Sequence, residues 1–192
     1  MSKSRLEAFS DGVLAILITI MVLEMKVPHG EGWGSLKPLI PVFLSYVLSF
    51  LYLGIYWSNH HHLLQAAQHV KGRTLWANLH LLFWLSLIPF VTGWMGENHF
   101  GPLPVALYGI VLLLSGIAYY LLALDLVALH GKDSSLGRAL GKDYKTKISM
   151  ALYAVAIPVS FKFPLLSCLT YFAVALLWFI PDRRIEKKLH AP

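Results

Sequence analysis

The stretch RLEAFSDGVLAILITIMVLE, residues 5–24, decides how the chain folds. Its uncharged run from 12 to 23 is 12 residues long and lies between Asp11 and Glu24. A helix that crosses a membrane needs about 20 residues, so a spanning helix here carries both carboxylates at or inside the bilayer edges. Ionisable side chains at that depth face protein or water rather than lipid. The first helix is therefore expected in the interior of an assembly.

The composition is that of an integral membrane protein. Of the 192 residues, 57% are hydrophobic and 14% are charged, and the mean hydropathy is +0.61. Several long apolar runs follow the first one, so a cleaved signal peptide does not explain the hydrophobicity. The runs are continuously apolar rather than alternating, which favours helices over a β-barrel. The predicted fold is all-α.

Six transmembrane helices are predicted in a single domain that covers residues 1–192. The last two are short and are separated only by residues 162–163, which indicates a tight helical hairpin. The segment 131–146 is rich in Gly, Lys, Asp and Ser and is predicted to be a solvated loop. The six predicted spans are 6–28, 38–66, 74–95, 103–130, 147–161 and 164–180.

The basic residues indicate how the chain is oriented in the membrane. Thirteen of the sixteen Lys and Arg residues lie in the N-terminus, the 66–73 and 130–147 loops and the C-terminal tail. The positive-inside rule therefore puts both termini in the cytoplasm, in agreement with an even number of spans. The pI near 9.4 then reflects topology, and anionic lipid headgroups rather than nucleic acid are the expected partner. The opposite side holds only Lys26, Lys37 and Lys162.

One face of the first helix carries an aliphatic stripe. At about 100° per residue, Asp11 and Ser10 fall on the back of the helix, with Asp11 about 140° from the stripe. The stripe either faces lipid and neighbouring helices or lines an axis of symmetry. On an axis, its aliphatic rings would form a constriction that can gate by dewetting, and its hydroxyl would replace part of an ion's hydration shell. The carboxylates at both ends of the run favour the axis. The stripe consists of Ile16, Thr19, Ile20 and Leu23.

The end of the second span supplies polar partners. The sequence YWSNHHH occupies residues 56–62, at the cytoplasmic end and at the depth of Ser10 and Asp11. Trp57, His60 and His61 share one helix face by their spacing of three and four residues. A carboxylate, a hydroxyl, an indole N–H and a histidine at one depth can form a fully satisfied buried network.

The three successive histidines do not predict a metal centre. Consecutive helical residues point about 100° apart, so three of them cannot bind one ion. The single cysteine, Cys168, excludes a thiolate site, and no metal or cofactor is predicted. Asp125, near the inner end of the fourth span, is expected to pair with a cationic or histidine side chain.

Two motifs together resemble the transmembrane protein 175 family of potassium channels, which have no selectivity-filter loop. Arg5-xxx-Phe9-Ser10-Asp11 opens the first span and Trp57-xx-His60 closes the second. The resemblance covers essentially the whole chain and includes the sequence LIPF, residues 87–90, in the third span. Animal members carry two six-span repeats and occupy endosomes and lysosomes. Prokaryotic members carry one repeat, as this chain does, and assemble as homotetramers.

The resemblance implies a role for each residue of the first two helices. It puts Ile16 at the narrowest hydrophobic position and Leu23 at a further aliphatic ring, while Ile20 is added from helix geometry. It gives Thr19 the hydroxyl layer linked to selectivity, with permeating K⁺ near Ile16 and Thr19. The polar network that joins the two helices would consist of Arg5, Phe9, Ser10, Asp11, Trp57 and His60, with Asn59 and His61 as additional members.

The resulting prediction is a homotetrameric channel, weakly to moderately selective for potassium over sodium, in a prokaryotic inner (plasma) membrane. The first helix lines the pore of this channel. The protein is not expected to be an enzyme. The alternative is a proton-coupled secondary transporter with Asp11 and His60 as the proton relay. That alternative requires a substrate site at the midplane and broken helices in repeated halves, and the sequence displays neither. A metalloenzyme built on residues 60–62 is a third and weaker alternative.

Overall fold

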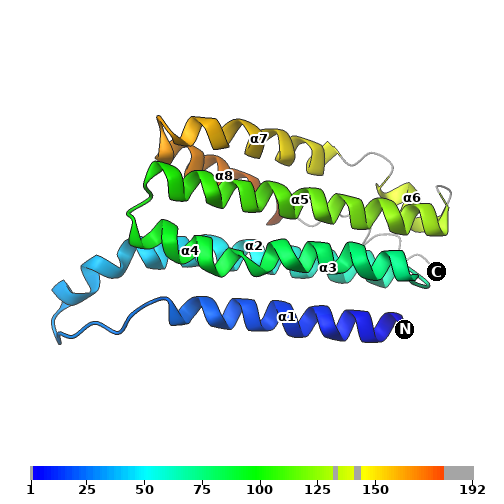
Figure 1. Ribbon diagram of the computed structural model, residues 1–192, viewed down its shortest axis with the longest axis horizontal. Coiled ribbons are helices and arrows are strands. Elements are labelled where there is room, and N and C mark those ends of the chain that lie inside the picture. The colour runs from blue at the N-terminus through cyan, green and yellow to red at the C-terminus, as the bar shows by residue number, and fades with distance from the viewer. Residues whose placement is uncertain (1, 132–133, 141–143, 180–192) are drawn as a thin grey trace.

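The computed structural model describes residues 2–131, 134–140 and 144–179, and all regular structure in these residues is helical (Figure 1). An all-helical chain satisfies its backbone hydrogen bonds within each segment, as the hydrocarbon of a membrane demands. The elements are α1 (Lys3–Leu23), the 3-10 helix η1 (Trp33–Leu39), α2 (Ile40–Ala66), α3 (Gly72–Ser86), α4 (Ile88–Glu97), α5 (Pro102–His130), α6 (Ser135–Leu140), α7 (Tyr144–Ser160) and α8 (Pro164–Phe179).

Four helical stretches within the described residues are long and apolar enough to cross a membrane. They are Lys3–Leu23, Trp33–Ala66, Gly72–Glu97 and Pro102–His130, which match the first four predicted spans to within a few residues. The predicted hairpin of the last two segments is confirmed, because α7 and α8 pack together across the turn 161–163. These two helices have only 17 and 16 residues, fewer than the roughly 20 that a straight span requires. The last residue of the sixth predicted span, at position 180, lies outside the described residues.

The third span is two helices in line. α3 ends at Ser86 and α4 begins at Ile88, with only Leu87 between them. Pro89 occupies the first turn of α4. A proline lacks the N–H that a continuous helix requires and its ring clashes with the carbonyl four residues earlier, so the helix restarts here.

The prediction of a solvated loop over residues 131–146 is wrong in part. α6 occupies Ser135–Leu140, and α7 begins at Tyr144. Two features stabilise α6. The Gly137 amide donates to Ser134 Oγ at 3.0 Å, which is a helix-capping contact, and Leu136 is buried. The composition of the loop did not reveal that one leucine anchors it to the core.

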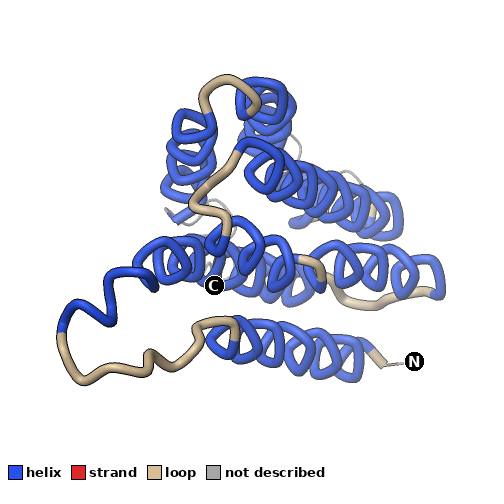
Figure 2. Tube along the Cα trace, turned by 60° about the vertical axis from the view of Figure 1, so that its left-hand side comes forward, coloured by secondary structure: helices blue, strands red, loops and turns tan. Residues whose placement is uncertain are grey.

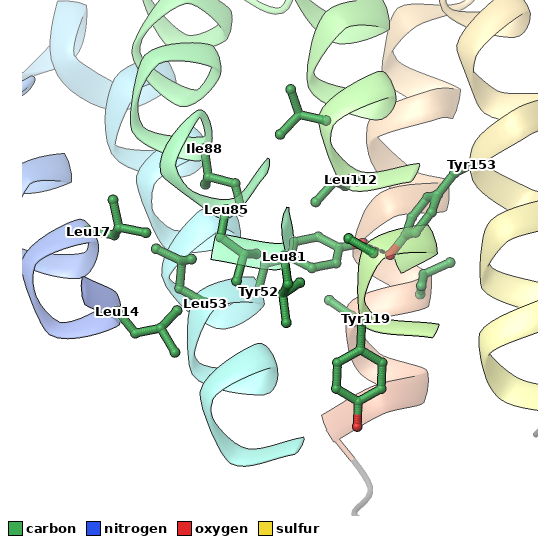
Figure 3. Packing of buried hydrophobic residues seen from close by; sticks show 14 of the residues in the cluster. Leu14, Leu17, Tyr52, Leu53, Leu81, Leu85, Ile88, Leu112, Tyr119 and Tyr153 are labelled. Atoms are coloured by element: carbon green, nitrogen blue, oxygen red, sulfur yellow. Dashed lines mark hydrogen bonds between the residues drawn. The ribbon is translucent and has the colours of Figure 1, made fainter. Parts of the chain in front are cut away.

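α1 lies along one edge of the bundle, with α2, α3 and α4 beside it and α5, α7 and α8 on the far side (Figures 1 and 2). α1 packs mainly on α2, α3 and α4, while α5 packs on α3 and α7. Leu14 and Leu17 of α1 point toward Leu53, Leu85 and Ile88 in the core (Figure 3). One side of α1 is therefore held by the bundle, and its other side lies at the edge.

The two ends of the bundle differ in charge, as the sequence predicts. Lys3 Nζ donates to Ala67 O at 2.9 Å, and Arg73 pairs with Asp125 at 2.9 Å. These contacts bring the N-terminus, the α2–α3 loop and the end of α5 to one end of the molecule (Figure 1). The connections α1–α2, α4–α5 and α7–α8 lie at the other end, and within the described residues they carry only three basic Lys or Arg side chains, Lys26, Lys37 and Lys162.

Candidate functional site

The two faces of α1 have opposite environments. The face that packs on the bundle is buried and consists of Leu6, Ser10, Leu14, Leu17 and Met21. The predicted stripe lies on the uncovered face: Ile16 is 56% exposed, Ile20 is 41% exposed and Leu23 is 77% exposed, and Thr19 is also exposed. No described element of the chain covers the stripe, so in one protomer it is free to face lipid or a second copy.

Arg5 and Phe9 share this uncovered face. The residues at positions 5, 9, 12, 16, 19 and 23 follow alternating steps of four and three, which is the heptad spacing at which helices pack along a seam. Phe9 is 50% exposed, and the Arg5 side chain is exposed and forms no hydrogen bond or ion pair with the described residues. The structure thus places Arg5 and Phe9 outside the polar network in which the sequence predicts them.

Thr19 presents an oxygen on the uncovered face. Its Oγ1 lies 3.1 Å from Ala15 O and 2.9 Å from Ile16 O, so the hydroxyl proton is donated back to the helix. The oxygen lone pairs are then left for an external partner. A hydroxyl in this state acts as an acceptor, which is what a cation requires of a ligand.

A buried polar chain joins α1, α2 and α3. Asn78 Nδ2 donates to Ser10 Oγ at 2.9 Å, and Ser10 Oγ donates to Leu6 O at 2.9 Å. On the other side of Asn78, Oδ1 lies 2.7 Å from His60 Nε2. Because Oδ1 can only accept, His60 Nε2 carries the hydrogen. Ser10 and Asn78 are fully buried and His60 is 2% exposed, so this chain of bonds fixes three helices at one depth.

The sequence-based prediction of the polar network does not include Asn78. Three helices meet at its amide, which is fully buried and both donates and accepts. The available signal was a lone amide in an apolar span at the depth of Ser10 and His60. Polar side chains at such positions bond to neighbouring helices, so the depth of Asn78 marks it as a candidate for the network without saying which side chains it bonds.

Asp11 belongs to a separate contact. Trp57 Nε1 donates to Asp11 Oδ1 at 3.0 Å, and the His61 ring stacks on Trp57 with centroids 6.2 Å apart. Trp57 is 48% exposed, so this contact lies at the side of the bundle. His60 bonds Asn78 and not Asp11. The Asp11 carboxylate and the His60 ring are therefore hydrogen-bonded to different partners.

Asn59 does not join α1 to α2. Its Nδ2 donates to Ile55 O of the same helix at 2.8 Å, and its backbone carbonyl accepts from Tyr119 Oη of α5 at 3.3 Å. Asn59 thus lies on the side of α2 that faces α5.

Asp125 has the cationic partner that the sequence predicts. Arg73 Nε lies 2.9 Å from Asp125 Oδ1, and Thr74 Oγ1 donates to Asp125 Oδ2 at 2.7 Å. The Asp125 side chain is 10% exposed, whereas that of Arg73 is 86% exposed. The carboxylate joins α3 to α5 near the basic end of the bundle.

The histidines do not converge on one point. His60 bonds Asn78, His61 stacks on Trp57, and the rings of His61 and His62 meet edge to face at 5.7 Å. Among the residues that the structure describes, no three His, Cys, Asp or Glu side chains come together as a metal site requires.

A bundle of apolar helices with one uncovered helix face and a polar anchor at one end is a multi-span membrane protein. The comparisons with known proteins agree. Residues 5–89 match the family model described as "Endosomal/lysosomal potassium channel TMEM175". A potassium channel of Chryseobacterium sp. (strain P1-3) is 55% identical over 189 residues, which is 98% of each chain. The chain therefore belongs to the TMEM175 family.

Two further comparisons extend this result. The crystal structure of a lysosomal potassium-selective channel TMEM175 homolog from Chamaesiphon minutus superposes with a TM-score of 0.82 at 28% identity, covering 94% of this chain and 97% of that one. The human endosomal/lysosomal proton channel TMEM175 is 39% identical over 75 residues, which is 33% of this chain and 15% of the human protein. The names of these relatives thus include both potassium and proton channels.

Proposed function

We propose that the chain forms a potassium channel in which α1 from each of four copies lines the pore. The observation that carries this proposal is the uncovered stripe of Ile16, Thr19, Ile20 and Leu23, opposite a face that the bundle buries. A symmetric assembly would cover the stripe and put it on a dry axis. The relatives described as potassium channels support the choice of ion.

In this proposal the residues of α1 have three different roles: closing the pore, coordinating the ion and anchoring the helix. Ile16, Ile20 and Leu23 form aliphatic rings that close the pore by dewetting and open it by widening. Thr19 supplies one oxygen per copy to a permeating K⁺, because its proton is already donated to the helix. Ser10, bonded through Asn78 to His60, holds the inner end of α1 on the bundle. The channel is weakly to moderately selective for potassium over sodium.

The proposal also includes the remaining features of the assembly. Residues 1–192 act as one channel domain with six membrane-crossing segments. Both termini lie in the cytoplasm, because the basic end of the bundle belongs on the cytoplasmic side. The protein resides in the plasma membrane of a prokaryotic cell and transports ions rather than catalysing a reaction.

The test is a planar-bilayer recording of the purified protein with potassium on one side and sodium on the other. A reversal potential displaced toward the potassium equilibrium value is expected, and Thr19→Val should move it toward zero because the oxygen ligand is lost. Thr170→Val is the matched control, since Thr170 makes the same hydroxyl bond to its own helix but lies on α8. A current that instead follows an imposed proton gradient would point to proton transport through Asp11 and His60.

A further inference from the structure

An apolar groove lies between α2 and α8, away from the stripe on α1. Its volume is about 400 Å³. Leu44 is 53% exposed and Leu169 is 64% exposed, so the groove opens sideways rather than into the bundle. The groove is lined by Leu44, Val47 and Leu48 of α2, by Phe100, and by Leu165, Cys168, Leu169 and Phe172 of α8.

The shape and chemistry of this α2–α8 groove suit a hydrocarbon chain. Apart from the Cys168 thiol, its lining side chains are hydrocarbon only, so an occupant gains nothing from polar groups. The lining positions on α8 run from Leu165 to Phe172, which is about 10 Å along a helix axis at about 1.5 Å per residue. The groove therefore runs from the helix end some way into the hydrocarbon of the membrane.

A cation lies in the turn that leads into the groove-lining helix α8. Lys162 is in the α7–α8 turn, three residues before Leu165, and is exposed. Its Nζ lies 5.5 Å from the centroid of the Phe163 ring, and it forms no ion pair with a described residue. Lys26, at the same end of the bundle, differs because it pairs with Glu97 at 3.1 Å. Lys162 thus offers a charge that an anion at the membrane surface complements.

We propose that the α2–α8 groove binds one acyl chain of an anionic phospholipid whose phosphate pairs with Lys162. The apolar lining accepts the chain, and the lysine in the turn that leads into α8 selects the headgroup. A lysine in this position extends its amine to the interface while its stem stays on apolar surface. This site is independent of the stripe on α1, so it is tested by binding and not by current.

Cys168 makes the test direct, because it is the single cysteine and it lies in the groove. A bimane fluorophore on Cys168 is read in phosphatidylcholine vesicles that contain a small fraction of phosphatidylglycerol with brominated chains. Phosphatidylcholine with the same brominated chains is the reference. Bromine quenches the fluorophore only on contact, so the quenching measures which lipid occupies the groove.

The expected result is a roughly fivefold preference for the brominated phosphatidylglycerol, the gain that one basic residue near a membrane surface supplies. Lys162→Gln should abolish the preference, and Lys26→Gln should preserve it. The double variant Leu166→Cys/Cys168→Ser moves the fluorophore two residues along α8 to an exposed position outside the groove, where no preference is expected.

Two results would overturn the proposal. Equal quenching of the Cys168 label by both lipids would show that Lys162 selects nothing. No quenching by either lipid would show that protein closes the groove, as a second copy of the chain would. Native mass spectrometry of the unlabelled protein is a second measurement: phosphatidylglycerol should bind the wild type about fivefold more tightly than it binds Lys162→Gln.

Discussion

Replacing Asn78 by Leu should loosen α1 from the bundle. Leucine has the same branching and the same number of side-chain heavy atoms as asparagine, but both hydrogen bonds of the amide disappear. Those bonds join Asn78 to Ser10 at 2.9 Å and to His60 at 2.7 Å. Hydrogen bonds between membrane helices contribute about 0.6 kcal/mol each on average and about 1.7 kcal/mol at most.

The loss of a partner for His60 adds to this effect. Its Nε2–H is buried and would have no acceptor, which costs about 1–3 kcal/mol. The expected destabilisation is therefore about 2–4 kcal/mol, counting both lost bonds and the unpaired donor. A change of about 2 kcal/mol corresponds to a roughly thirtyfold change in an opening equilibrium.

Hydrogen–deuterium exchange of the reconstituted protein measures this opening. Amides in the first half of α1 should exchange roughly thirtyfold faster or more in Asn78→Leu than in the wild type. Asn98→Leu is the matched control, because the Asn98 amide donates only to Trp94 O of its own helix segment. Unchanged exchange in α1, or an equal change in both variants, would refute the reasoning that Asn78 anchors the helix.

Three further predictions concern the contacts around α1 and α5. Trp57→Phe keeps an aromatic side chain but removes the N–H bonded to Asp11. Since Trp57 is half exposed, thermal unfolding should show a loss of stability below about 1 kcal/mol. Asp125→Leu should destabilise the protein by about 1–3 kcal/mol, because the buried Thr74 hydroxyl loses its acceptor. Asp125→Asn keeps an acceptor and should lower the stability less in the same unfolding experiment. Ile16→Asn should raise the single-channel conductance by wetting the constriction, and Val22→Asn, on α1 but off the stripe, should leave it unchanged.

The long helices could be predicted because hydrophobic runs of about 20 residues match the thickness of a bilayer and are rare in soluble proteins. The third span follows the same reasoning. Its length and apolar character are visible in the sequence, and Pro89 marks the break between α3 and α4. The short helix α6 was not visible, because its stability comes from the burial of Leu136 and not from an apolar run.

The candidate site shows the same limit. The depth of Ser10 and His60 could be predicted from the sequence, and so could the need of Asp125 for a cationic partner. The hydrogen-bond partners of Ser10 and His60 could not be predicted, because they depend on which faces of three helices meet. Asp11 and His60 were expected in one network, yet one bonds Trp57 and the other bonds Asn78. Helix rotation decides this, and no local spacing in the sequence encodes it.

The central claim is that the stripe on α1 lines the conduction path. The most direct test is the block of potassium current by a thiol reagent in Leu23→Cys, with Cys168→Ser to remove the native thiol. Val22→Cys in the same background is the control, because Val22 is also exposed, at 44%, but lies about 100° away around the helix. The account predicts block of the Leu23 variant alone. Block of the Val22 variant alone, or an unaffected current in both, would contradict it.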